Sequence, residues 1–393
     1  MATLTAARVD APLAALAGLC AAALAGVVLA VDGAVMAAPV HNDSTPVVAA
    51  VLAVVAVAGL QHSGSRRTGW MIATGCVLVL GTVRYIAPSD ADTDTQSALQ
   101  IVVAATAGIL LGAAIAATWG RASGQWAVIA GAWSAFLAAA ATGTERPFHS
   151  LHWTVPQWLL AITLVTVVAA ALVAQPGMRV QRADPRLWPV AVGAALALSV
   201  GYRLLGDRVT AESASSTVRM WLFVGGALLL LVIGAEVTAR FLPPGDGPFP
   251  MAVTGATVTA YPLVAALGGP EVPGWTPAVA VVAVLAGLRA APRMPRPELG
   301  LALALVTTAV AALWPDLAAD GWPLLVRVAL IAAGTGLALG SALPGSAPVA
   351  ALGAALPFAA LPVLGAVWSI AADPMLVVGA LVVAGAVCAW EVR

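Results

Sequence analysis

The sequence contains fourteen apolar runs, each near the length of about 20 residues that an α-helix needs to cross a lipid bilayer. The runs centre near residues 22, 53, 77, 108, 136, 166, 196, 229, 257, 282, 307, 331, 356 and 382. Closed β-barrels also satisfy their backbone in lipid, but their strands are only about 10 residues long and alternate strictly. The runs here are longer and do not alternate, so they predict an all-α integral membrane protein with about fourteen transmembrane helices.

The composition agrees with lipid as the main solvent. Hydrophobic residues make up 61% of the chain and charged residues 9%, whereas soluble domains carry about 25% charged residues. The net charge of zero gives no reason to expect a nucleic-acid partner. Cys20, Cys76 and Cys388 all lie inside apolar runs, and the four histidines are scattered. We therefore expect no disulfide framework, metal site or cofactor.

Arginine placement predicts the orientation. The chain has no lysine, and twelve of its 18 basic residues lie at the termini or in the loops that follow even-numbered runs. These twelve are Arg8, Arg66, Arg67, Arg121, Arg179, Arg182, Arg186, Arg240, Arg289, Arg293, Arg296 and Arg393. The opposite loops are mostly acidic, as in "PSDADTDT". By the positive-inside rule both termini are cytoplasmic, and we expect a multi-pass protein of a bacterial cell membrane.

The loops are too short for an extramembrane domain, so any function lies within the membrane or in short loops. The segment between the fifth and sixth runs offers Glu145, His149 and His152, which a membrane enzyme acting on a lipid would need clustered at one membrane face. A polar turn explains the same residues without chemistry. We therefore expect no enzymatic activity.

Several short motifs occur in order along the first six runs. The first run ends in "VDGAVMAAPV", with Asp32 and Pro39. The loop after the second run reads "VAGLQHSGSRR" and contains Gln61, Gly64, Arg66 and Arg67. The fourth run opens with "SALQI", which includes Gln100, and the sixth with the tryptophan-rich "LHWTVPQWLL".

These motifs, in this order, resemble the fourteen-helix drug:proton antiporter branch of the major facilitator superfamily. The resemblance implies a rocker-switch fold with an N-terminal six-helix half over residues 1–175, an extra helix pair over 176–245 and a C-terminal six-helix half over 246–393. It also implies a gate loop at Gln61, Gly64, Arg66 and Arg67. Gln61 stands where the family has an acid, and Ser97 where it has an arginine, so the proton-coupling motifs are degenerate.

Two charged residues are candidates for transport or coupling. If the first helix continues past Asp32, this carboxylate lies inside the membrane, where a charged group is costly and therefore indicates a functional role. If the helix ends near Val31, Asp32 is a solvated loop residue. Arg327 lies inside the twelfth run. It either extends to the membrane interface or serves as a buried partner for an acid or an anionic substrate.

The remaining candidates are polar residues within runs. Thr254, Thr257 and Tyr261 share one face of the ninth run, where they line a polar cavity or pack against neighbouring helices. Gln100 has the same two interpretations. Glu236 lies four residues before Arg240, so the two form a helical ion pair or part of a gate. Gly108 and Gly112 form a G-x-x-x-G frame, which permits close helix contact and is expected by chance in so glycine-rich a chain.

The sequence therefore supports two functional hypotheses. The first is a secondary transporter, an exporter of an amphipathic or lipid-like small molecule. The second is a non-transporting polytopic subunit or scaffold of an envelope assembly, which would require a protein partner in the membrane. In both, the surrounding partners are membrane lipids.

Overall fold

The computed structural model describes residues 2–34, 45–86, 93–138, 156–174, 180, 184–211, 217–267, 272–315, 321–370 and 374–393. In this part of the chain every regular element is a helix, and there are fourteen of them. They are α1 (Ala2–Ala34), α2 (Thr45–Ser63), α3 (Arg66–Ile86), α4 (Thr93–Thr118), α5 (Ala122–Ala138), α6 (Gln157–Val173), α7 (Leu187–Ala211), α8 (Thr217–Phe241), α9 (Pro248–Ala266), α10 (Thr276–Ala290), α11 (Pro297–Leu313), α12 (Gly321–Ser341), α13 (Ala347–Ile370) and α14 (Pro374–Glu391). The all-α prediction with fourteen helices is confirmed.

Ten of these helices are long and apolar enough to cross a membrane. The exceptions are α5, α6, α10 and α11, whose described parts have 17, 17, 15 and 17 residues. An α-helix rises about 1.5 Å per residue, so these four cover less than the roughly 30 Å of a typical hydrocarbon core. The chain is a multi-pass membrane protein, and the described parts of four of its fourteen helices have fewer than the about 20 residues that the sequence runs suggested.

The first six helices pack in a regular pattern. Helix α1 contacts α4, α5 and α6, while α4 contacts α1, α2 and α3, and α3 contacts α6. Exchanging α1 with α4, α2 with α5 and α3 with α6 maps this set of contacts onto itself. The arrangement is that of two three-helix repeats, which recur in transporter folds.

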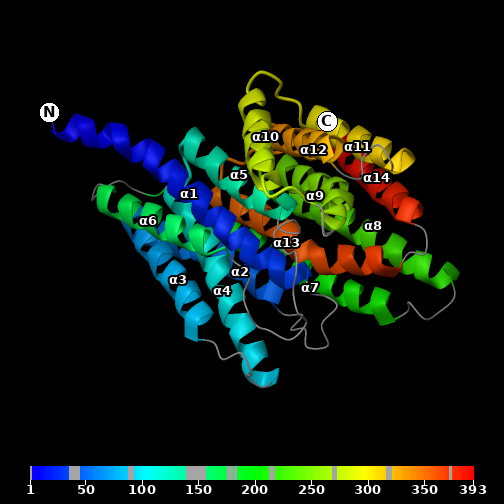
Figure 1. Cartoon of the computed structure of the whole chain (residues 1–393), viewed down its shortest axis with the longest axis horizontal. Helices are drawn as coiled ribbons and strands as arrows, with labels where there is room; N and C mark the ends of the chain where they lie inside the picture. The colour runs from blue at the N-terminus through cyan, green and yellow to red at the C-terminus, as the bar shows by residue number, and fades with distance from the viewer. Residues whose placement is uncertain are drawn as a thin grey trace.

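The last six helices repeat the pattern. Helix α9 contacts α12, α13 and α14, while α12 contacts α9, α10 and α11, and α11 contacts α14. In Figure 1 the first group (blue to green) lies mainly on the left of the molecule and the last group (yellow-green to red) mainly on the right. The groups meet where α2 and α1 contact α13 and where α5 contacts α10, and we call this boundary the seam.

Helices α7 and α8 belong to neither pattern. Helix α7 packs on both α13 and α2, and therefore on both sides of the seam. Helix α8 packs on α7, α9 and α14. In Figure 1 both lie at the lower right, beside α13.

Close helix contacts depend on glycine. A Cβ atom added to Gly108 or Gly112 of α4 would lie 2.3 Å from the carbonyl oxygen of Ala49 or Ala53 of α2. In the last six helices, a Cβ on Gly336 of α12 would lie 2.3 Å from the Val284 oxygen of α10. Each distance is a clash with backbone atoms. The G-x-x-x-G frame in α4 therefore permits the close packing of α2 on α4.

Hydrogen bonds connect the junctions that follow even-numbered helices. The amide of Val180, between α6 and α7, donates to the Gly64 oxygen between α2 and α3 at 3.1 Å. The amide of Gly345, between α12 and α13, donates to Asp246 Oδ1 between α8 and α9 at 2.7 Å. The first bond joins two junctions that carry arginines in the sequence, and the second joins the α8–α9 and α12–α13 junctions, so both bonds agree with the junctions after even-numbered helices lying on one face.

Candidate functional site

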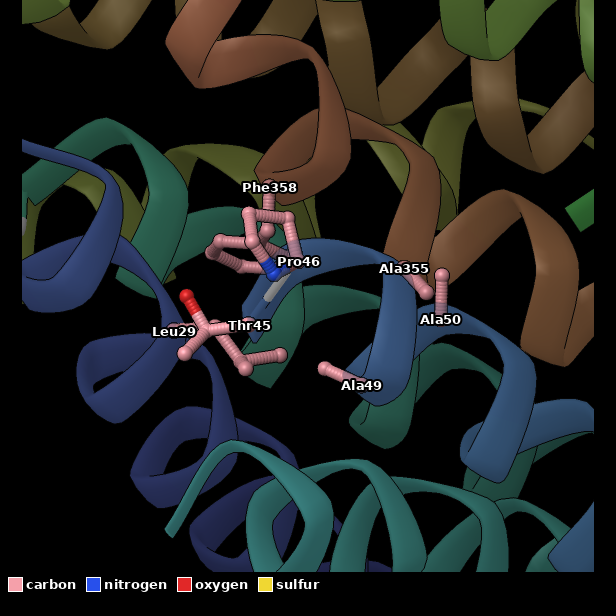
Figure 2. Close-up of a pocket in the computed structure, with 7 residues that line it drawn as sticks. All are labelled: Leu29, Thr45, Pro46, Ala49, Ala50, Ala355 and Phe358. Atoms are coloured by element: carbon pink, nitrogen blue, oxygen red, sulfur yellow. The ribbon is translucent and has the colours of Figure 1, made fainter. Parts of the chain in front are cut away.

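The seam contains a small cavity between α1, α2 and α13 (Figure 2). It is lined by Leu29, Thr45, Pro46, Ala49, Ala50, Ala355 and Phe358. Its volume is about 10 Å³, which is near the minimum for one water molecule. The lining is apolar except for Thr45. The two six-helix groups are thus in contact here, and the cavity has no room for a substrate in this conformation.

Phe358 fills the seam with an aromatic side chain. Its ring centroid lies 5.9 Å from that of Phe136 on α5, edge to face, and Phe136 in turn lies 5.4 Å from Trp133. A Cβ on Gly26 of α1 would lie 3.0 Å from Phe358 Cζ, so α1 accommodates the ring only because residue 26 has no side chain. Such edge-to-face contacts add to the apolar burial of the rings. Phe358 therefore closes the seam by inserting from α13 against α1 and α5.

The cavity lies away from the arginine-rich junctions. Thr45 begins α2, whereas Arg66 and Arg67 follow its other end. Leu29 lies near the end of α1, far from Asp10 at the other end of that span. If the arginine-rich face is cytoplasmic, the contacts around the cavity close the seam toward the outside.

The α2–α3 junction, for which the resemblance predicts a gate, forms a tight turn on the opposite side. Gly64 has a φ of 71°, in the left-handed region that favours glycine, and its amide donates to the Leu60 oxygen at 3.0 Å. This geometry ends α2, and α3 begins two residues later at Arg66. Gln61, at the position where the antiporter family has an acid, is 6% exposed. A neutral amide thus occupies a buried position beside the turn.

The two adjacent arginines have different environments. Arg66 is 9% exposed, and its Nη2 donates to the Trp119 carbonyl oxygen just beyond the end of α4 at 3.2 Å. A guanidinium group there meets the negative end of the α4 dipole. Arg67 is exposed. The pair therefore combines one residue that fastens α3 to α4 with one that faces the surroundings.

An ion pair beside Arg66 was not anticipated from the sequence. Asp10 of α1 is 6% exposed, and its Oδ2 lies 2.8 Å from Nη2 of Arg121 in the α4–α5 junction. Arg66 interacts electrostatically with both residues. An acid directly before the first apolar run was the one available signal, because Arg121 was assigned only to topology. Together the three residues connect α1, α3 and the α4–α5 junction.

The candidates on α9 are buried. Thr254, Thr257 and Tyr261 are 4%, 3% and 8% exposed. Thr257 donates to the Val253 oxygen of its own helix at 2.8 Å, and the Tyr261 ring meets Trp368 of α13 edge to face, with centroids 6.1 Å apart. They line neither the seam cavity nor the other cavity described below.

The structure disperses the other candidates. Gln100 on α4 and Arg327 on α12 are half-buried, and Glu236 forms an ion pair with Arg240 on the surface of α8. Helix α1 continues through residue 32 to Ala34, so the backbone of Asp32 is helical, but its side chain lies outside what the structure describes. Glu145, His149 and His152 also lie outside the described residues. None of the described hydrogen bonds or ion pairs joins two of the candidates on α4, α8, α9 and α12.

Comparisons with known proteins found structures with a similar fold but no matching family. No family model and no curated protein sequence matches the chain. Among solved structures, a partially occluded inward-open form of the xylose transporter XylE from E. coli is 12% identical, with a TM-score of 0.49 over 97% of this chain and 98% of that one. A double-tryptophan mutant of XylE is 12% identical, with a TM-score of 0.50 over 99% of this chain and 96% of that one. The likeness to the second structure shows the fold alone: the helices of this chain are arranged as in that XylE mutant.

Proposed function

We propose that the protein is a secondary transporter and that the structure is its form closed at the seam. The observation that carries the proposal is the repeated six-helix arrangement, α1–α6 and α9–α14, with contacts between the two groups along α2–α13 and α5–α10. Transporters with such repeats alternate by rocking one bundle against the other around a central site. The halves would be residues 1–175 and 246–393, with the extra pair at 176–245.

The proposed substrate is an amphipathic or lipid-like small molecule, moved outward. The supporting feature is the character of the residues that face one another across the closed seam and would be exposed when it opens: Leu29, Phe358 and alanines dominate, and Thr45 supplies the one hydroxyl group of this lining. Such a surface suits an apolar compound better than a sugar, whose hydroxyls need hydrogen-bonding partners when buried. The membership in the drug:proton antiporter branch rests on the motifs of the first six helices and stays a prediction, as does the cytoplasmic position of both termini.

The proposed transporter would not use the gate loop to carry a proton. The side chain at position 61 is a buried glutamine, which neither gains nor loses a proton in the physiological range. Asp32, in the last turn of α1, is the acid that we propose for coupling. Neutralising it as Asp32→Asn should abolish coupled movement in proteoliposomes.

Thiol accessibility tests the proposal without knowledge of the substrate. Cys20, Cys76 and Cys388 are buried, so the background reaction is low. Ala50→Cys and Ala355→Cys place thiols in the seam cavity from opposite groups. If the seam opens, a membrane-impermeant maleimide added outside will label both. Ile86→Cys, exposed near the end of α3, serves as the reactive control, and Ala114→Cys, fully buried, as the unreactive one.

Transport of small molecules into proteoliposomes is a second test of the proposal. Proteoliposomes would be assayed with ethidium as an amphipathic probe and xylose as a sugar probe. Ethidium movement that depends on the protein and stops on maleimide labelling of Ala355→Cys supports the proposal. Thiols at the seam that remain as unreactive as Ala114→Cys, with neither probe transported, would overturn it.

One observation favours a scaffold as the second candidate. The seam cavity is nearly filled, and α7 contacts both α2 and α13 across the boundary. A permanently closed bundle has these features. A scaffold should then co-purify in mild detergent with a partner at fixed stoichiometry while its seam thiols stay unreactive.

A further inference from the structure

A second cavity lies on the outer surface of the first six helices, and we call it the α2–α3 groove. It is lined by Leu52, Val55, Ala56, Gly59, Leu60, Thr68, Ile72 and Ile109. Its volume is about 300 Å³, thirty times that of the seam cavity. All lining side chains except Thr68 are apolar. The groove is therefore an apolar surface that is separate from the seam.

The groove follows from how the helices pack. Helices α2 and α3 each lie along α4 but scarcely contact one another, so Ile109 of α4 forms the floor between them. The lining residues of α2 recur at the spacing of one helix face. Gly59 has no atom within 4 Å of an added Cβ, so the groove is open at that point. Its walls lack the packing contacts that an occupant would supply.

The groove runs in the direction of a lipid chain. It begins at Leu60 and Thr68, next to the arginine-rich α2–α3 junction, and extends to Leu52. Eight residues of helix span about 12 Å, which is nearly half of a hydrocarbon core of about 30 Å. The groove therefore opens at the headgroup level of the arginine-side leaflet and ends near the midplane.

The width of the α2–α3 groove is close to that of a single hydrocarbon chain. A volume of about 300 Å³ spread over about 12 Å corresponds to a cross-section of roughly 25 Å². An α-helix about 10 Å across has a cross-section of roughly 80 Å², so a partner helix could insert only its side chains. A single extended hydrocarbon chain fits this cross-section. The groove therefore matches one acyl chain of the surrounding bilayer along its whole width.

A positively charged residue adjoins the lining of the groove in the sequence. Arg67 immediately precedes Thr68, is exposed, and makes no ion pair within the described part of the chain. We propose that the α2–α3 groove binds one acyl chain of an anionic phospholipid of the arginine-side leaflet, with its phosphate at Arg67. A basic residue near a membrane surface favours anionic lipid by about 1 kcal/mol, which corresponds to a preference of about fivefold. This inference does not rest on transport and holds equally for a scaffold.

Photo-crosslinking tests the proposal. The full-length protein would be placed in phosphatidylcholine nanodiscs containing a small fraction of either phosphatidylglycerol or phosphatidylcholine with a diazirine in the acyl chain. Labelled peptides would then be mapped by mass spectrometry. We expect peptides with Leu52–Leu60 and Thr68–Ile72 to be labelled above the exposed face of α8, and about fivefold more with phosphatidylglycerol than with phosphatidylcholine.

Two matched glycine variants make the test specific. Gly59→Leu fills the groove from within α2 and should reduce groove labelling several-fold. Gly225→Leu, at an equally open and exposed position in α8, should leave groove labelling unchanged. Val55→Phe provides a second way to fill the groove. Arg67→Gln should keep the labelling but remove the preference for phosphatidylglycerol.

Three results would overturn the proposal. The first is uniform labelling of α2, α3 and α8, which indicates annular lipid only. The second is groove labelling that survives both Gly59→Leu and Val55→Phe. The third is an unchanged lipid preference in Arg67→Gln, which removes the headgroup contact.

Discussion

Arg66 and Arg67 differ by one position in sequence and by their whole environment in the fold. Arg66 is buried and bonded to the Trp119 oxygen, whereas Arg67 is exposed. We expect Arg66→Gln to lower the free energy of unfolding by about 1–3 kcal/mol, because it removes a charged hydrogen-bond donor from a buried carbonyl. Arg67→Gln should change it by less than about 0.5 kcal/mol. Equilibrium unfolding in mixed detergent micelles measures both, and equal losses would contradict the distinction.

The Asp10–Arg121 ion pair gives a second prediction at this scale. Asp10 is almost completely buried, so Asp10→Asn leaves Arg121 and Arg66 close together without their acid. We expect a loss of about 2–4 kcal/mol in the free energy of unfolding. The exposed pair on α8 is the control, and Glu236→Gln should cost at most about 0.5 kcal/mol. A double-mutant cycle with Arg121→Gln that shows no coupling would refute a stabilising pair.

The sequence identified single residues better than it identified their partners. It placed Arg66 and Arg67 at a gate loop, but it gave no sign that Arg66 binds α4 or that Asp10 meets Arg121, because both contacts join distant parts of the chain. Thr254, Thr257 and Tyr261 share a face of α9, as their spacing predicts. Periodicity cannot say whether that face meets a cavity or a neighbouring helix, since packing decides it.

At the scale of helices, glycine determines which pairs approach closely. We expect Gly112→Ala to lower the free energy of unfolding by about 1–3 kcal/mol, because its Cβ would overlap the Ala53 oxygen and force α2 away from α4. Gly225→Ala lies in open space in α8 and should be neutral or stabilising by up to about 1 kcal/mol. Thermal unfolding followed by tryptophan fluorescence compares the two, and a neutral Gly112→Ala would show that α4 can shift without cost.

The number of helices was predictable and their partners were not. Lipid requires long apolar helices, so each run of about 20 residues marks one. The same requirement makes both faces of a helix apolar, which removes the periodicity that would show the inward face of a soluble helix. The α2–α4 contact was visible only as a glycine frame that chance also explains. Helices α10 and α11 are shorter than expected because prolines and polar residues begin them at Thr276 and Pro297.

At the scale of the whole molecule, the position of α7 bears on any rocking motion. Helix α7 packs on α13 more extensively than on α2, and α8 packs on α9 and α14. The extra pair is therefore joined mainly to the last six helices. If the halves rock, α7 should move with α13 while α2 slides along it. The sequence placed the extra pair between the halves in the chain but could not place it across the seam in space.

A disulfide tests this motion. An added Cβ on Gly206 of α7 would lie 3.6 Å from Val363 Cα of α13, so oxidation of the pair Gly206→Cys and Val363→Cys is the way to join the two helices. Leu29→Cys, which lines the seam cavity from α1, reports opening by its reaction with an impermeant maleimide. We expect the α7–α13 disulfide to leave that reaction rate unchanged, because both helices belong to one moving body. Loss of Leu29→Cys labelling that returns on reduction would show instead that α7 holds the two halves together, and would favour a permanently closed scaffold.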